Sequence, residues 1–298
     1  MRIGVLGTGL MGAPMAQRLK QAGHDVVAWN RSAEKLEPLR LLRIETVDRA
    51  AAAIAPLTLT MLTDAAALQA TLFPEDIVPS DVRSQDTRPD LTGCTILQMG
   101  TIAPAESRAL AQQVSAAGGE YLEAPVLGSI PQVKTGELIL MVGATPAQFE
   151  RWQPVLRCFS ADPQLMGPVG AGAAVKLAMN QLIGTLTAAF SMSLAFVQRQ
   201  GLAVEPFMEI VRQSALYAPT FDKKLARMCD RNFANPNFPT QHLLKDMRLF
   251  ADAAQADGID TQTAQAVARV AEQAMALGLA QSDYSALFAA VAGDAVSA

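Results

Sequence analysis

The chain has 298 residues, half of them apolar, and a net charge of −4, which allows two domains with buried cores. No basic block stands out, which argues against nucleic acid as a partner. The three cysteines, Cys94, Cys158 and Cys229, are far apart and only two histidines are present, His24 and His242. The small number and wide spacing of cysteines and histidines argue against a disulfide framework, a metal site or a histidine-based catalytic centre. They predict a reducing, cytoplasmic compartment.

The N-terminal residues predict a strand, a glycine turn, a helix and a second strand. Residues 3–6 are apolar, and Gly7-Thr8-Gly9-Leu10-Met11-Gly12 follows them as a G-x-G-x-x-G motif. Apolar residues then recur at helical spacing until Gly23, and residues 26–29 read as a strand. In this context the motif indicates a dinucleotide-binding βαβ unit, whereas a glycine-rich turn without a ligand is the plainer alternative.

Each glycine of this turn has a physical reason. Gly7 allows a sharp turn out of the strand, Gly9 leaves room for a pyrophosphate, and Gly12 allows the helix to pack closely on the strand. The helix N-terminus, with Leu10 and Met11 beside it, would then present backbone N–H groups to the phosphates.

The end of the second strand indicates which cofactor is bound. An acidic residue there would bind the ribose 2′-hydroxyl of NAD, but this chain has Asn30-Arg31-Ser32. Arg31 can pair with a 2′-phosphate, and Ser32 can donate a hydrogen bond to it. We therefore predict NADP(H) in preference to NAD(H). The alternative is that Arg31 is only a solvated charge.

Strands and helices alternate along the following residues. The expected strands cover 57–62, 95–99, 121–126 and 138–142, and the expected helices cover 34–42, 50–54, 65–72, 106–117 and 146–156, with Thr63-Asp64 as a cap. Residues 74–91, with three prolines, are expected to form a long surface loop. The alternation predicts an α/β Rossmann-type, doubly wound parallel sheet. Its ligand edge would hold the loops at 7–12, 62–63, 100–101 and 127–129.

After Gly167 only helical periodicity continues. A long helix is expected over 172–200, and further helices near 206–214, 221–228, 242–257, 261–277 and 282–290. We therefore predict an NADP-binding domain over 1–165 and an all-helical domain over 166–298, which begins with a long interdomain helix. The apolar stretch 177–197 carries polar residues such as Asn180 and Thr187 at regular intervals, which favours a buried helix over a membrane span.

Lys176 and Asn180 are four residues apart and so lie on one face of the long helix. Their neighbours are small or apolar, and a lysine in such a place is costly unless it is paired or used. The alternative from the spacing alone is a lysine whose amine extends into solvent at the start of a helix.

Five stretches together resemble the β-hydroxyacid dehydrogenases, the family that includes 3-hydroxyisobutyrate dehydrogenase and glyoxylate/succinic semialdehyde reductase. They are the glycine motif, GHDVVAWNRS at 23–32, EAPVLGS at 123–129, GAGAAVKLAMNQ at 170–181 and HLLKDMRL at 242–249. The resemblance covers nearly the whole chain in the same order. It implies a Rossmann domain, a long connecting helix, a helical C-terminal domain for substrate binding and oligomerisation, and a homodimer or homotetramer.

The resemblance also implies roles for single residues. Lys176 matches the catalytic lysine, which protonates the carbonyl oxygen as hydride arrives, and Asn180 matches the asparagine beside it. Thr101 matches a residue near nicotinamide and substrate. Lys245 matches a lysine that reaches cofactor and substrate. The turn at Leu62 and Thr63 would pass the cofactor ribose.

The substrate loop departs from the family pattern D/E-A-P-V-S-G. Leu127 stands where a serine hydroxyl helps to hold the substrate carboxylate, while the backbone N–H groups of Gly128 and Ser129 could still bind an anion. A smaller departure is Gly100-Thr101 in place of serine-threonine.

The resemblance implies an NADPH-dependent reductase of a small aldehyde or keto acid that carries a carboxylate. The composition predicts no metal and no membrane or nucleic-acid partner. Three alternatives remain. Arg31 argues against an NAD-linked 3-hydroxyisobutyrate dehydrogenase. Lys176 argues against an imine reductase, since those relatives usually carry Asp or Tyr at that position. Lys176 and Asn180 argue against a non-catalytic NADP-binding protein, although Leu127 keeps that reading open.

Overall fold

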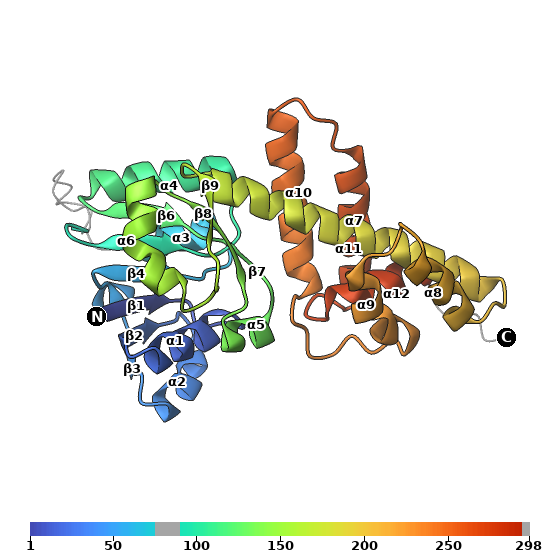
Figure 1. Cartoon of the computed structure of the whole chain (residues 1–298), viewed down its shortest axis with the longest axis horizontal. Helices are drawn as coiled ribbons and strands as arrows, with labels where there is room; N and C mark the ends of the chain where they lie inside the picture. The colour runs from blue at the N-terminus through green and yellow to red at the C-terminus, as the bar shows by residue number, and fades with distance from the viewer. Residues whose placement is uncertain (75–89, 294–298) are drawn as a thin grey trace. The chain divides into compact units, whose positions relative to one another are not determined.

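The computed structural model describes residues 1–74 and 90–293, so the loop expected over 74–91 lies, from 75 to 89, outside the described residues. The chain forms two compact units, Met1–Lys176 and Leu177–Ala298 (Figure 1). The expected domain limits, 1–165 and 166–298, stay a prediction. Each unit is described by itself below.

The first unit is built on a predominantly parallel sheet, which confirms the predicted Rossmann-type fold. Its strands run in the order β3-β2-β1-β4-β5-β6-β8-β7, with β9 paired to β8. The pairs from β3 to β6 are parallel, whereas β8 runs antiparallel to β6 and β7. The strands are β1 (Arg2–Leu6), β2 (Asp25–Trp29), β3 (Glu45–Thr46), β4 (Leu57–Thr60), β5 (Thr95–Gln98), β6 (Glu120–Glu123), β7 (Val126–Leu127), β8 (Ile139–Gly143) and β9 (Gln164–Gly167).

Helices cover both faces of this sheet because its strands are apolar on both sides. Val26 and Ala28 of β2 belong to the core shared with α1, α2, α5 and α6, whereas Val27 belongs to the core shared with α3 and α4. This alternation follows from the two-residue period of a strand. The helices are α1 (Gly12–Gln21), η1 (Ala33–Leu36), α2 (Glu37–Leu41), η2 (Ala50–Ala53), α3 (Ala65–Leu72), α4 (Pro104–Ala116), α5 (Ile130–Thr135) and α6 (Pro146–Leu156).

The second unit is helical throughout its described residues, as predicted. The long helix α7 (Ala171–Arg199) begins in the first unit and continues into the second. The other helices are α8 (Val204–Gln213), α9 (Pro219–Cys229), α10 (Thr240–Ala256), α11 (Gln262–Ala276), η4 (Tyr284–Ala286) and α12 (Leu287–Ala292). Helices α10 and α11 pack side by side (Figure 1), and their buried side chains form one core with Ala188 of α7.

One helix in the described part of the chain, α7, could cross a membrane by length and composition alone. Its most apolar window has a mean hydropathy of 1.3, and half of that window is buried within the protein. Two buried hydroxyls of α7 bond back to the helix: Thr187 donates to the carbonyl of Ile183 and Ser191 to that of Thr187, each at 2.7 Å. Helices in the core of soluble proteins have the same properties.

The structure corrects some of the expected element limits. The strand expected over 121–126 is divided into β6 and β7 around Ala124 and Pro125, where proline has no N–H to donate to a neighbouring strand. The segment expected at 50–54 is a short 3₁₀ helix, and α5 and β9 were not expected. The expected cap of α3 is confirmed, since the Asp64 carboxylate accepts a 2.7 Å hydrogen bond from the N–H of Ala67.

Candidate functional site

The glycine turn after β1 combines two crowded glycines with one open glycine. A Cβ atom on Gly7, where φ is +97°, would lie 2.3 Å from the carbonyl oxygen of Met61, and one on Gly12 would lie 1.9 Å from that of Gly7. A Cβ on Gly9 would meet no heavy atom within 4 Å. The backbone is therefore tightly packed on both sides of Gly9 and accessible at Gly9 itself, which is the shape that a pyrophosphate requires.

Helix α1 begins at Gly12 without a side-chain cap. Met11, which precedes it, makes no capping hydrogen bond, and the first turn carries no acidic residue. Leu10 is exposed beside it. The positive end of the helix dipole is therefore not offset by a carboxylate of α1, which suits an anionic ligand.

Asn30 at the end of β2 is bound to the glycine turn. Its side-chain oxygen accepts a 3.0 Å hydrogen bond from the N–H of Thr8, and its amide nitrogen donates to the carbonyl of Ser32 at 3.1 Å. Arg31 follows directly and is exposed, while Ser32 is half-buried. Asn30 thus orders the glycine turn, and Arg31 is the residue that follows Asn30 in the sequence.

The loops expected at the ligand edge do lie together at the carboxyl ends of the strands. Backbone hydrogen bonds link neighbouring strand ends, from Met61 to Leu6 at 2.8 Å, from Met99 to Thr60 at 2.9 Å and from Ala124 to Gln98 at 2.7 Å. A Cβ on Gly100 would lie 2.7 Å from the carbonyl oxygen of Leu62. The segments with Leu62–Thr63 and Gly100–Thr101 are therefore packed against each other, and the serine usual at 100 would not fit without a shift.

The substrate loop follows β6 at the same edge. Leu127 is half-buried in β7 opposite Ile139, and Gly128 adopts φ +132°. Both the N–H and the hydroxyl of Ser129 donate to the side-chain oxygen of Gln132, at 2.9 and 2.7 Å. The N–H of Ser129, which we expected to be available to an anion, is thus engaged within the chain.

Asn180 and Lys245 meet at a buried carboxylate in the second unit. Asp246 is 1% exposed. Its Oδ2 accepts a 2.5 Å hydrogen bond from the amide of Asn180, and its Oδ1 lies 2.8 Å from Nζ of Lys245. No role was predicted for Asp246 from the sequence. The available signal was an acidic residue next to Lys245 on an amphipathic helix.

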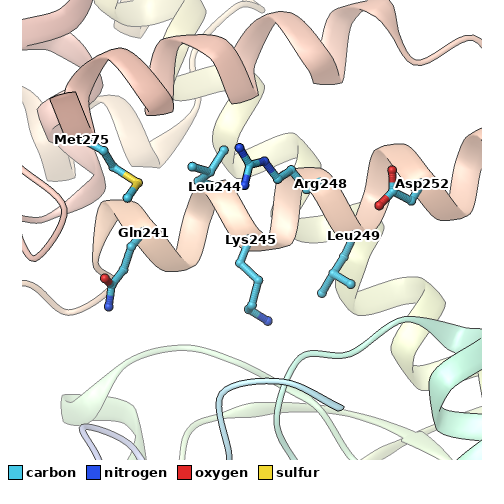
Figure 2. Close-up of a pocket in the computed structure, with 7 residues that line it drawn as sticks. All are labelled: Gln241, Leu244, Lys245, Arg248, Leu249, Asp252 and Met275. Atoms are coloured by element: carbon cyan, nitrogen blue, oxygen red, sulfur yellow. The ribbon is translucent and has the colours of Figure 1, made fainter. Parts of the chain in front are cut away.

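Lys245 also lines a pocket of about 300 Å³ on the second unit. Figure 2 shows Gln241, Lys245 and Leu249 pointing to the same side of α10, one turn apart. The remaining lining residues are Leu244, Arg248, Asp252 and Met275. Within residues 1–74 and 90–293, no group of three His, Cys, Asp or Glu side chains is placed to hold a metal ion.

Comparison with known proteins gives two family matches that together span the chain. Residues 2–170 match the NAD binding domain of 6-phosphogluconate dehydrogenase, and residues 170–291 match the NAD-binding domain of NADP-dependent 3-hydroxyisobutyrate dehydrogenase.

Similar proteins include two named reductases. The chloroplastic glyoxylate/succinic semialdehyde reductase 2 of Arabidopsis thaliana is 32% identical over 97% of this chain and 79% of its own length. The 2-hydroxy-3-oxopropionate reductase of Escherichia coli is 31% identical over 98% of this chain and 97% of its own length. The structure of 3-hydroxyisobutyrate dehydrogenase from Mycobacterium tuberculosis has a TM-score of 0.82 at 22% identity, covering 96% of this chain and 97% of that one, and shows the shared fold.

Proposed function

Because the chain belongs to the β-hydroxyacid dehydrogenase family of oxidoreductases, we propose that it interconverts a small aldehyde or keto acid and its hydroxyacid with NADP(H). The observation that carries this proposal is the glycine turn, where Gly9 alone leaves open space at the uncapped start of α1. The same sheet edge carries the loops with Thr101 and Leu127. A cofactor on this turn would thus lie beside the residues proposed for the substrate.

Three features support NADP(H) as the cofactor. The end of β2 carries Asn30-Arg31-Ser32 and no acidic residue, Arg31 is exposed, and the C-terminal match is to an NADP-dependent enzyme. The guanidinium of Arg31 would pair with the 2′-phosphate. The glycine turn from Gly7 to Gly12 would hold the pyrophosphate, and Leu62 and Thr63 would pass the ribose.

Bound NADPH would supply the hydride. Lys176 would donate a proton from Nζ to the carbonyl oxygen of the substrate, and in the reverse direction it would accept the proton of the alcohol. Asn180, one turn further along α7 and oriented by Asp246, would hold the substrate or orient the lysine. Thr101 and the backbone at Gly128 would contact the substrate, and Leu127 would give one wall of its pocket an apolar character.

The substrate class follows from the similar proteins. Their names state reduction of glyoxylate, succinic semialdehyde and 2-hydroxy-3-oxopropionate, which all combine a carboxylate with a nearby carbonyl. We further propose a homodimer or homotetramer. An exposed apolar row along α7, with Leu182, Met192 and Phe196 at 50, 57 and 66% exposure, supports association with a second copy.

The proposal is tested by following NADPH oxidation with glyoxylate, succinic semialdehyde, methylmalonate semialdehyde, tartronate semialdehyde and a cyclic imine, each repeated with NADH. We expect turnover of at least one carboxylate-bearing aldehyde with NADPH. Lys176→Ala should lower kcat by about 10²- to 10⁴-fold, the usual contribution of positioned proton transfer, while NADPH still binds.

The matched control is Lys223→Ala, which removes an exposed lysine of α9 and should leave the rate unchanged. A Lys176→Ala variant with the rate of the wild type would refute the proposed mechanism. Turnover of the cyclic imine alone would assign the chain to imine reduction.

A further inference from the structure

Glu123, the last residue of β6, is a carboxylate buried away from solvent, with 1% exposure. No lysine, arginine or histidine is paired with it among the ion pairs of the described residues. Burying a charge is costly unless its oxygens accept hydrogen bonds. The hydrogen-bond partners of each oxygen therefore indicate the task of this carboxylate.

The two oxygens of Glu123 bind different partners. Oε1 accepts hydrogen bonds from the backbone N–H groups of Gly170 at 2.8 Å and Ala173 at 3.0 Å. Oε2 accepts a hydrogen bond from the hydroxyl of Ser107, which in turn lies 2.8 Å from the hydroxyl of Tyr121. Because the Ser107 proton is given to Glu123, Tyr121 donates to Ser107, and the three side chains form one directed chain.

The two backbone donors belong to the first turn of α7. The first hydrogen bond of that helix runs from the N–H of Ala174 to the carbonyl of Gly170 at 3.0 Å, so Gly170 is the N-cap and Ala173 the third helical residue. An N-cap side chain normally accepts from the N–H of that third residue. Gly170 has no side chain, and Glu123 supplies the missing acceptor from the neighbouring strand. Its negative charge also suits the positive end of the helix dipole.

Two further glycines make room for this carboxylate. A Cβ on Gly143 would lie 2.4 Å from Oε1 of Glu123, and one on Gly172 would lie 3.2 Å from the same atom. Gly143 is also the residue of β8 that pairs with Glu123. The surrounding backbone therefore leaves space for a side chain of this length and holds it in one position.

We propose that Glu123 is a positioning residue that fixes Lys176 relative to the substrate loop. Lys176 lies three residues beyond Ala173, one helical turn along α7, and the substrate loop begins directly after Glu123. One carboxylate thus joins the two segments that must meet at the substrate. The inference rests on the proposed function, because it assigns Lys176 the proton transfer.

The test compares two variants of Glu123. Glu123→Met keeps the approximate size of the side chain but accepts no hydrogen bonds, so the first turn of α7 should loosen. We expect kcat to fall by about 10- to 100-fold, which is the scale of loss when a catalytic group is misplaced by an ångström, with the KM for NADPH unchanged. Glu123→Gln retains an oxygen that can accept both backbone bonds, and it should therefore keep most of the wild-type kcat.

A double-mutant cycle separates positioning from general destabilisation. If Glu123 acts through Lys176, then Glu123→Met should reduce kcat no further in a Lys176→Ala background. An equal fall in both backgrounds, or an unchanged kcat in the single variant, would overturn the proposal. Ser107→Ala is the control for the other carboxylate oxygen, since it leaves both bonds to α7 intact.

Hydrogen exchange gives a readout that does not depend on activity. In Glu123→Met, amides in the first turn of α7 should exchange faster, while those of α8 (Val204–Gln213) should not change. Failure of the proposed function would appear separately, as an inactive wild type or a fully active Lys176→Ala variant. In that case unchanged exchange in α7 would still overturn the inference, and faster exchange there would support it.

Discussion

At the scale of single residues, the end of β2 divides its tasks between neighbours. The amide of Asn30 bonds to Thr8 and Ser32 and so orders the glycine turn, whereas Arg31 extends into solvent. The sequence predicted a contact with the cofactor for all of Asn30, Arg31 and Ser32. The structure gives Asn30 a further task within the chain, because both of its amide atoms are bonded there, and its contact with the cofactor stays a prediction.

Arg31→Ala should therefore change cofactor preference. We expect the Kd for NADPH to rise by about tenfold or more, the loss of one or two charge-assisted hydrogen bonds, with little change for NADH. Isothermal titration with both cofactors measures the ratio. Arg157→Ala, which removes an exposed arginine after α6, is the control. An unchanged ratio in Arg31→Ala would mean that other residues select the cofactor.

At the scale of elements, the contact between β1 and α1 shows that two glycines of the motif are needed for different reasons. Gly12 packs against the carbonyl of Gly7, while Gly9 faces open space. Both are required by the motif, yet only Gly12 is required by the folded protein without its cofactor. The sequence pattern predicted both positions, and the distances show which of them is needed for packing.

Two alanine variants should behave in opposite ways. Gly12→Ala places a methyl group 1.9 Å from the carbonyl oxygen of Gly7 and should lower the free energy of unfolding by about 1–3 kcal/mol, as overpacking does. Gly9→Ala should keep the Tm of the cofactor-free protein but weaken NADPH binding. Thermal melts with and without NADPH measure both effects. A loss of Tm in cofactor-free Gly9→Ala would contradict this assignment.

At the scale of the whole molecule, we expect the two histidines to make the free energy of unfolding depend on pH. Burial is the main cause that lowers the pKa of His24 and of His242, and Lys245 lowers that of His242 further, while Asp246 opposes the shift. A folded pKa below the unfolded value of 6.5 means that the unfolded chain binds more protons. The stabilisation that each neutral histidine contributes is complete above the unfolded pKa of 6.5. It is lost as the pH falls through the lower pKa of the folded state.

We expect the Tm to decrease between about pH 7.5 and pH 5.5, above the range in which most carboxylates titrate. His242→Gln should reduce this dependence, because the ring of His242 is the more deeply buried of the two and stacks on Phe238 with centroids 6.5 Å apart. His24→Gln should have the smaller effect. Melting curves across this range measure the slopes. Equal slopes in the wild type and His242→Gln would rule out His242 as the cause.

The sequence by itself determined the Rossmann-type sheet, the helical second part and the family. These depend on local signals, namely alternating strand and helix periodicity and glycines at fixed spacing, which stay readable without any tertiary contact. Short elements such as α5 and β9 were not predicted, because segments of six and four residues carry too little periodicity. The division of the strand expected over 121–126 was not predicted, because the apolar run on both sides of Pro125 is a stronger local signal for a strand than the single proline is against it.

Only the tertiary structure decided how the polar groups of the site are partnered. Glu123 bonds to α7 across 47 and 50 residues of sequence, and Asn180 bonds to Asp246 across 66. No local pattern encodes such pairs, because the partner of a buried polar group is chosen by which backbone and side-chain atoms the fold brings within hydrogen-bond distance. The sequence therefore identified the residue types for the chemistry, and the folded chain determined which of their neighbours hold them in place.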